Sequence, residues 1–256
     1  MITRNILSKL YFHPLFLFIA FICALTGNFK EFTIFFLLII IHELGHIIGG
    51  LYYNWNIEKI IILPFGGITI FNIKLNTPLK EEFIVTILGP MFQMIFYILC
   101  INLFFDNVIL TRYHYPLLIF NLIPIIPLDG SKIFNIIFNK IFCFKNSHLL
   151  SILISCLIIL SIFIIVIYNN YGLIYILMFL FLIIKTISEI KSHKQLINKF
   201  VLERYLYNFK FKNIKIIKNK KINNMFKDKK HFFYLNDKLY EESAILKKMF
   251  DFKGIL

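Results

Sequence analysis

Long runs of Ile, Leu and Phe, separated by short polar segments, make up most of the chain as far as about residue 190. A helix needs about 17–25 predominantly apolar residues to cross a bilayer. Six segments fit this pattern, the first of them short: residues 14–27, 32–53, 83–105, a fourth that begins near Tyr115 and breaks up after Asn121, 149–168 and 171–184. The pattern predicts an all-α polytopic membrane protein with six transmembrane helices.

The segment between the second and third apolar runs has a different residue pattern. Residues 57–63 and 68–75 are rich in Ile and flank the sequence Pro64-Phe65-Gly66-Gly67. Short β-branched runs around turn residues are typical of two strands joined by a turn. Open sheet edges are not tolerated in lipid unless they line a protected cavity. We therefore expect a small membrane-associated β-hairpin, either at the cytoplasmic interface or facing a polar cavity.

The composition excludes an ordinary cytosolic enzyme and a disordered chain, because 59% of the residues are hydrophobic and 16% are charged. Residues 191–256 contain 17 Lys and Arg against 6 Asp and Glu, a net +11 of the whole chain's +14. Such a tail could bind nucleic acid or rest near anionic lipid. It has no nucleic-acid motif, so we expect no direct nucleic-acid binding. Residues 1–190 are predicted to form the membrane domain and 191–256 a short basic cytoplasmic tail.

The distribution of basic residues also predicts the orientation, because cytoplasmic loops carry an excess of Lys and Arg. With six spans, one side of the membrane has the whole tail and Arg4, Lys9, Lys59, Lys74, Lys80, Lys132, Lys140 and Lys145. The other side has only Lys30 and Arg112, each near an acid, Glu31 or Asp106. Both termini should therefore be cytoplasmic.

The second apolar run contains His42-Glu43-Leu44-Gly45-His46, an H-E-x-x-H motif. Positions i and i+4 of a helix lie on one face, so both imidazoles can reach one Zn²⁺. Glu43 is offset beside them, where it can take a proton from water at the metal. Two histidines in a helix core are the alternative, but unliganded histidines are costly in this apolar setting. The motif therefore predicts a zinc site within the membrane.

Zinc bound by two histidines needs a third protein ligand. The candidates are Asp129, His13, His114 and His148. We favour Asp129, because Pro124 and Pro127 prevent a regular helix just before it. Irregular backbone at membrane depth is tolerated where it lines a cavity. By the span count, Asp129 also lies on the same cytoplasmic half of the membrane as the histidines.

Together these motifs resemble the site-2 protease family of intramembrane zinc metalloproteases, and most closely its bacterial sporulation branch. The family's features are H-E-L-G-H in a membrane segment followed by N-x-x-P-x-x-P-L-D-G, here beginning at Asn121. Further matches to the branch are Leu63-Pro64-Phe65-Gly66-Gly67, Pro78-Leu79-Lys80-Glu81-Glu82-Phe83, Gly89-Pro90 and Leu202-Glu203-Arg204-Tyr205. The resemblance extends over about residues 10–210.

The resemblance implies roles for five residues. His42, His46 and Asp129 match the family's zinc ligands, Glu43 its catalytic glutamate, and Asn121 a polar residue that helps to position substrate. It also implies a substrate and partners. Proteins of this branch cut a membrane-associated pro-sigma factor in the mother-cell membrane around the forespore of a spore-forming bacterium, and membrane partner proteins hold them inactive. Branch members end in a nucleotide-binding CBS domain, whereas only about fifty residues follow Tyr205 here. The tail is thus either a reduced CBS-like unit or a basic docking segment, and ATP binding is in doubt.

These features predict an intramembrane zinc metalloendopeptidase. Three alternatives remain open: a site-2 protease that acts on an anti-sigma factor, a membrane metal-ion transporter, and an inactive scaffold. No PDZ domain lies between the motifs, which disfavours the first, and several apolar runs contain no ionisable group, which disfavours transport. The full set of His42, Glu43, His46 and Asp129 disfavours a scaffold.

Overall fold

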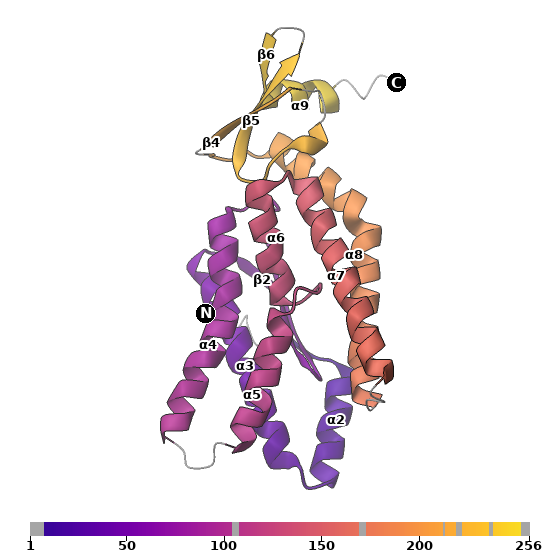
Figure 1. Cartoon of the computed structure of the whole chain (residues 1–256). Helices are drawn as coiled ribbons and strands as arrows, with labels where there is room; N and C mark the ends of the chain where they lie inside the picture. The colour runs from indigo at the N-terminus through magenta and orange to yellow at the C-terminus, as the bar shows by residue number, and fades with distance from the viewer. Residues whose placement is uncertain are drawn as a thin grey trace. The chain divides into compact units, whose positions relative to one another are not determined.

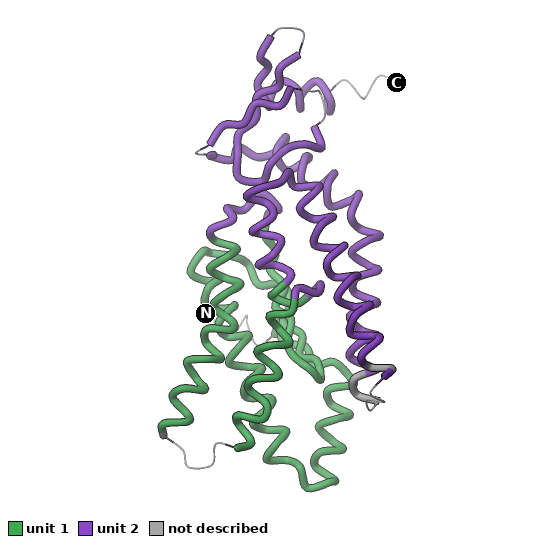
Figure 2. The backbone as a smooth tube through the Cα atoms, in the orientation of Figure 1, with its two compact units in different colours: residues 1–73, 81–123, 128–130 green, residues 74–80, 124–127, 131–256 purple. Residues whose placement is uncertain are grey.

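The computed structural model describes residues 8–103, 108–168, 173–211, 213–218, 222–235 and 238–251. The chain forms two compact units (Figure 2). Unit 1 comprises residues 1–73, 81–123 and 128–130, and unit 2 comprises residues 74–80, 124–127 and 131–256. Arg4, Asp106 and Tyr171, which entered the orientation and the span predictions, lie outside the described residues.

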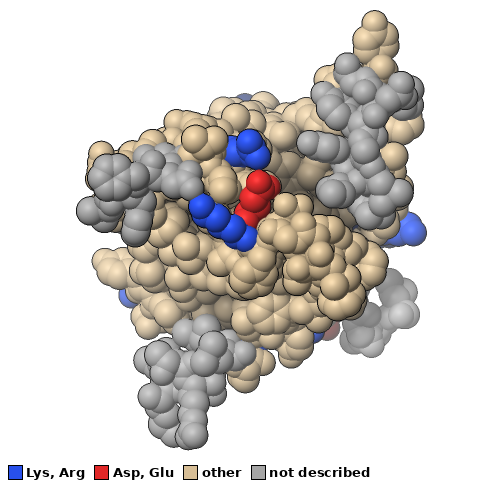
Figure 3. Space-filling model, turned by 90° about the horizontal axis from the view of Figure 1, so that it is seen from below, with Lys and Arg blue, Asp and Glu red and all other residues tan. Residues whose placement is uncertain are grey.

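The helices of the first half follow the apolar runs (Figure 1). They are α2 (Pro14–Leu25), α3 (Phe29–Tyr52), α4 (Leu79–Leu103) and α5 (Val108–Leu122). Among the described residues, three segments are long and apolar enough to cross a membrane: Phe29–Tyr52, Leu79–Asn102 and Phe144–Ile165. Helix α2 is apolar but shorter. The face seen from below in Figure 1 carries few charged side chains (Figure 3).

Unit 1 contains a three-stranded sheet where the sequence predicts a hairpin. Strands β2 (Asn56–Leu63) and β3 (Gly66–Asn72) pair antiparallel, and Leu63 is opposite Gly66 at the turn. The third strand, β1 (Leu10–Phe12), pairs parallel with β2 and was not predicted. It has three residues, too few to show an alternating pattern, and its pairing joins segments about fifty residues apart.

The sheet packs against α3 through a shared hydrophobic core. Leu38, Ile39 and Ile47 of α3 lie in one buried cluster with Ile60 and Ile62 of β2. Because side chains alternate along a strand, these isoleucines point to the same face. Because β3 is paired with β2, packing of this face against α3 also brings β3, at one edge of the order β1-β2-β3, into contact with α3.

The backbone is irregular between α5 and α6 (Asp129–Ile141), as Pro124 and Pro127 predict. Gly130 permits a close approach here, since a Cβ at this residue would lie 2.1 Å from the carbonyl oxygen of Leu122. The chain therefore folds back tightly and places Asp129 at the first turn of α6.

Unit 2 contains two long helices, α7 (Phe144–Tyr168) and α8 (Leu173–Leu206). The predicted sixth apolar run ends at residue 184, but α8 continues to Leu206. The reason is that Phe200 and Val201 are buried in a second core with Ile217 and Phe233, so the polar end of the helix is held by packing. Residue 190, the predicted domain boundary, lies within this helix.

The tail folds into a small α/β unit, so the prediction of an all-α chain with one hairpin was incomplete. Strands β4 (Asn213–Ile217), β5 (Lys229–Leu235) and β6 (Lys238–Glu241) form a second sheet in the order β4-β5-β6. A 3-10 turn, η1 (Ile222–Asn224), precedes β5, and α9 (Glu242–Asp251) packs on the sheet. The sheet and α9 share a small set of buried apolar side chains that includes Phe233, Ile245 and Leu246. These positions are hard to recognise in a sequence so rich in Lys.

Arg204 is the centre of the polar interactions in the tail. Its side chain is 1% exposed and its Nη1 donates to the Glu242 carboxylate at 3.0 Å. Its Nε donates to Asn76 Oδ1 at 2.7 Å, and its Nη2 donates to the carbonyl oxygens of Phe226 and Lys227. One buried guanidinium therefore joins the end of α8, the tail sheet and the segment before α4.

Candidate metal centre

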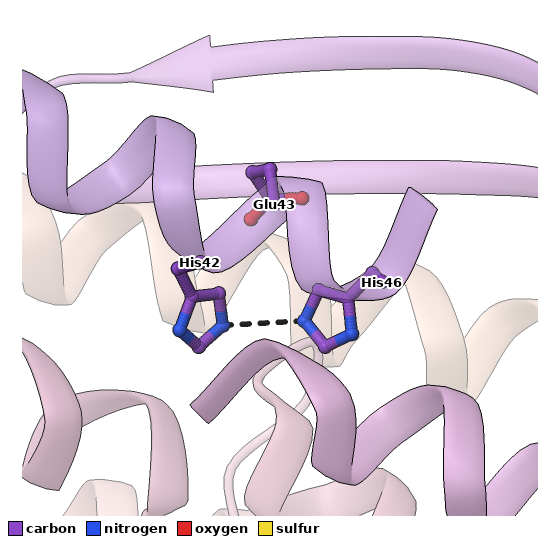
Figure 4. Close-up of side chains that lie close together, drawn as sticks. All are labelled: His42, Glu43 and His46. Atoms are coloured by element: carbon purple, nitrogen blue, oxygen red, sulfur yellow. Dashed lines mark hydrogen bonds between the residues drawn. The ribbon is translucent and has the colours of Figure 1, made fainter. Parts of the chain in front are cut away.

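Helix α3 presents His42 and His46 one turn apart on its buried face (Figure 4). The two residues are 2% and 5% exposed. Their Nε2 atoms lie 3.2 Å apart. The helical spacing of H-E-x-x-H thus places two imidazole nitrogens where one ion could contact both.

Asp129 joins the two histidines from the start of α6. Its Oδ2 lies 2.9 Å from Nε2 of His42 and 2.9 Å from Nε2 of His46. It is 5% exposed. Asp129, which is 87 residues from His42 and 83 from His46 in the sequence, therefore lies at the same point as their two Nε2 atoms.

The outer nitrogens of the two imidazoles show which atoms face this point. Nδ1 of His46 lies 2.9 Å from the carbonyl oxygen of Val85, and Nδ1 of His42 lies 3.0 Å from Oε1 of Gln93. Both oxygens can only accept, so each Nδ1 carries the hydrogen. In a neutral ring of this tautomer, the lone pair of Nε2 points toward the Asp129 carboxylate.

Three electron-pair donors that face one another repel unless a cation lies between them. Zinc accepts this donor set of two imidazoles and one carboxylate, the set of many catalytic zinc sites. Tetrahedral ligands about 2.0–2.2 Å from zinc are about 3.3–3.6 Å apart, and the donor atoms here, at 2.9–3.2 Å, are a few tenths of an ångström closer. The residues present therefore fit a zinc ion with little adjustment.

Glu43 lies beside the two histidines and is fixed by β3. Thr69 Oγ1 donates a hydrogen bond of 2.6 Å to Glu43 Oε2. Carboxylate and imidazole atoms of Glu43, His42 and His46 lie within 4.8 Å of one another. A Cβ at Gly67 would lie 2.5 Å from Glu43 Cγ, so only glycine leaves room for this carboxylate.

Helix α4 approaches the histidine helix closely because both helices have glycines at the contact. A Cβ at Gly45 would lie 2.2 Å from the Leu88 carbonyl oxygen, and one at Gly89 would lie 2.3 Å from His46 Nε2. Gly89 of α4 therefore lies directly against the ring of His46.

Asn121 is buried near the end of α5, at 6% exposure. The nearest atom to a Cβ built at Gly66 is Asn121 Oδ1, at 4.0 Å. Asn121 therefore faces Gly66 at the β2–β3 turn. The following residue, Gly67, lies against Glu43.

The other candidates for the third ligand have different partners. His13 caps α2, where its Nδ1 accepts from the Leu15 amide. His148 lies in unit 2, bonded to Glu189 and His193 at 2.8 and 2.7 Å. His114 contacts Gln93, and Gln93 in turn contacts His42, so His114 itself does not reach the three converging donor atoms.

Thr69 and Gln93 were not predicted from the sequence, because neither belongs to a motif. The one signal available for Gln93 is that it is a polar residue in the middle of an apolar run.

Comparison with known proteins agrees with this geometry. Residues 31–111 match the profile of Peptidase family M50. The chain is 32% identical over 213 residues to stage IV sporulation protein FB of Bacillus subtilis, with 78% of this chain and 73% of that protein covered. It is 33% identical over 129 residues to a protein named zinc metalloprotease from Methanocaldococcus jannaschii, with 45% of this chain and 36% of that protein covered. The solved structure of a site-2 protease from Methanocaldococcus jannaschii superposes with a TM-score of 0.57 at 27% identity, covering 70% of this chain and 89% of that one.

The chain belongs to peptidase family M50, the site-2 proteases. It is accordingly a membrane-embedded zinc metalloprotease. The family uses zinc, and the His42-Glu43-His46 group lies on a helix that is long and apolar enough to cross a membrane.

Proposed function

We propose that His42, His46 and Asp129 hold the zinc ion and that Glu43 is the general base of peptide-bond hydrolysis. The observation that carries this assignment is the convergence of two Nε2 atoms and one Oδ2 atom within 3.2 Å. Bound zinc supplies Lewis acidity, which makes water a nucleophile near neutral pH and polarises the scissile carbonyl. Glu43 takes the proton of the attacking water and delivers it to the leaving amine.

The support for the role of Glu43 is its fixed position. The hydrogen bond from Thr69 leaves the other carboxylate oxygen, Oε1, as the site of proton transfer. Burial excludes bulk water, so proton transfer occurs in a site of low polarity. Asn121 donates its side-chain amide to the substrate backbone or to the developing oxyanion, in keeping with its place beside the β2–β3 turn.

The substrate binds as an extended segment on the free edge of β3. A helical peptide hides its carbonyl groups, so substrate must unwind before it is cut. Among the described strands β3 pairs only with β2, and its Thr69 contacts Glu43. A strand added there would lie next to the base and take main-chain hydrogen bonds.

A proline substitution at Phe71 tests this binding mode. The Ile60 amide bonds on the β1 side of β2, so the main-chain groups of Ile61 and its partner Ile68 face each other, and those of Thr69 and Phe71 face the free edge of β3. Proline removes the amide hydrogen that an added strand would need. Cleavage by Phe71→Pro should fall while zinc content stays unchanged, and unchanged cleavage would reject strand addition. Phe71→Ala is the control, because it removes the ring and keeps the amide. Prolines in β2 are uninformative, because β2 is paired on both sides.

The substrate is the pro-sequence of a membrane-associated sporulation sigma factor. Similarity to stage IV sporulation protein FB over most of both chains supports this assignment. On the same basis, the protease works in the mother-cell membrane around the forespore of a spore-forming bacterium, and membrane partner proteins hold it inactive. Six spans place both termini in the cytoplasm, with residues 1–190 as protease domain and 191–256 as basic tail.

Co-expression with a candidate pro-sigma factor tests the proposed reaction. A shortened product should form with the native chain and disappear with Glu43→Gln, which removes the base and keeps the size. The matched control is Glu58→Gln, the same chemical change at an exposed position of β2. Loss of the product in both variants, or in neither, would contradict the assignment. Cleavage of an anti-sigma factor in place of the pro-sigma factor would correct the substrate alone.

A further inference from the structure

Gln93 is a fully buried amide on α4, with 0% exposure, in a helix that is otherwise apolar at this depth. An amide left without hydrogen bonds is costly in such a setting, so the contacts of Gln93 indicate what it does there. Its Oε1 lies 3.0 Å from Nδ1 of His42. Its Nε2 lies 3.1 Å from the carbonyl oxygen of His114 and 3.5 Å from Nδ1 of the same residue.

The chemistry of these partners fixes the orientation of the amide. The His114 carbonyl oxygen can only accept a hydrogen bond, so the NH₂ group of Gln93 must face it. Oε1 must then face His42. Because an amide oxygen only accepts, Nδ1 of His42 must carry the ring hydrogen.

The position of this hydrogen determines what the opposite nitrogen can do. A neutral imidazole has one ring hydrogen, and in water it occupies either nitrogen. With the hydrogen on Nδ1, the lone pair of Nε2 points toward Asp129 Oδ2 and His46 Nε2. With the hydrogen on Nε2, it would occupy the space of a metal ion.

We propose that Gln93 is a positioning residue that fixes the tautomer and ring orientation of His42, and so presents Nε2 to the metal. This inference rests on the proposed role of His42 as a zinc ligand. The equivalent partner of His46 is a main-chain group, the carbonyl of Val85, two turns earlier on the same helix. Helix α4 thus orients both histidines, once through its backbone and once through the Gln93 side chain.

His114 holds Gln93 in place. It is 0% exposed, and its ring stacks on Tyr97 with centroids 4.0 Å apart and an interplanar angle of 8°. The strongest contact with Gln93 is to the His114 backbone, so side-chain changes at His114 act weakly. Partners of this kind in metalloproteins affect metal affinity by about 10- to 100-fold when they are removed.

The test compares zinc affinity of the full-length protein in detergent, measured by chelator competition after metal removal. Gln93→Met keeps the side-chain length but removes the acceptor, and should weaken zinc binding about 10- to 100-fold. Gln93→Glu keeps an acceptor oxygen and, in its protonated form, a donor, and should restore binding to within a few-fold of the native chain. The control is Thr86→Val, because this buried hydroxyl donates only within α4, to the Glu82 carbonyl.

The visible spectrum of the Co²⁺-substituted protein separates positioning from a general loss of fold. It should change in Gln93→Met and match the native spectrum in Gln93→Glu. Native-like affinity and spectrum in Gln93→Met would overturn the proposal, as would equal weakening in the Met and Glu variants. If Gln93→Met does not fold, Gln93→Asn, whose shorter amide does not reach His42, replaces it under the same criteria. Failure of the native chain to bind zinc would instead reject the proposed site.

Discussion

Thr69 of β3 donates a 2.6 Å hydrogen bond to Glu43 of α3, so the edge strand of the sheet holds the residue proposed as the general base. Thr69→Val keeps the shape of the side chain and removes this donor. A hydrogen bond to a charged group contributes about 1.5–3 kcal/mol, so kcat should fall about tenfold or more while zinc content stays unchanged. Thr69→Ser should retain most activity. Equal activity of the Val and native proteins would show that Glu43 is held by other contacts.

Gly67 and Gly66 provide a matched pair for testing the packing around Glu43. A Cβ at Gly67 would lie 2.5 Å from Glu43 Cγ, whereas the nearest atom to a Cβ at Gly66 is 4.0 Å away. Gly67→Ala should therefore displace the carboxylate and abolish most cleavage, and Gly66→Ala should change cleavage little. Both are measured as product formed per unit of folded protein. Comparable activities of the two variants would contradict the described approach of β3 to Glu43.

The tail should lose stability in mild acid because of His231 and Glu242. Burial lowers the pKa of His231, and the charge of Arg204 adds to this against the opposing hydrogen bond with Glu242. Protonation would also remove the acceptor at Nε2, which accepts from the Phe226 amide at 2.9 Å. A histidine with a lowered folded-state pKa keeps its stabilising effect above the ordinary value of about 6.5 and loses it as pH falls below that value.

Glu242 acts in the same direction. Burial would raise the pKa of its carboxyl, but the hydrogen bond from His231 and the charge of Arg204 outweigh burial and hold the pKa below its ordinary value. Its contribution is therefore present near neutral pH and lost at lower pH. Hydrogen exchange of residues 229–246, corrected for intrinsic rates, should speed up between pH 7 and about pH 5. Unchanged protection over this range would contradict the buried neutral state of His231.

Arg204→Met tests the buried ion pair of the tail. Removal of one partner leaves the other charge uncompensated, which costs about 3–5 kcal/mol for buried pairs. The variant should expose the tail to limited proteolysis while zinc content stays at the native level. Lys230→Met is the control, because its ion pair with Glu241 is about half exposed. A resistant tail in Arg204→Met would show that apolar packing alone holds it.

The sequence predicts those parts of the site in which local geometry decides. The i, i+4 spacing of His42 and His46 requires only a helix, and the break before Asp129 requires only two prolines. Thr69 and Gln93 could not be assigned in this way, because their contacts with α3 arise from tertiary packing between separate elements. For the same reason β1 was missed, because a three-residue strand carries no periodic signal. The tail could only be left between a reduced CBS-like unit and a basic docking segment, because its buried apolar positions are few and lie among many lysines.

The central claim is that His42, His46 and Asp129 together hold one zinc ion. The most direct test is the zinc content of the purified full-length protein and of its Asp129→Ala variant, with His148→Ala as the control. The native protein and the control should each contain one zinc per chain, and Asp129→Ala should contain little or none. Full zinc content in Asp129→Ala, or loss of zinc in His148→Ala alone, would contradict the account.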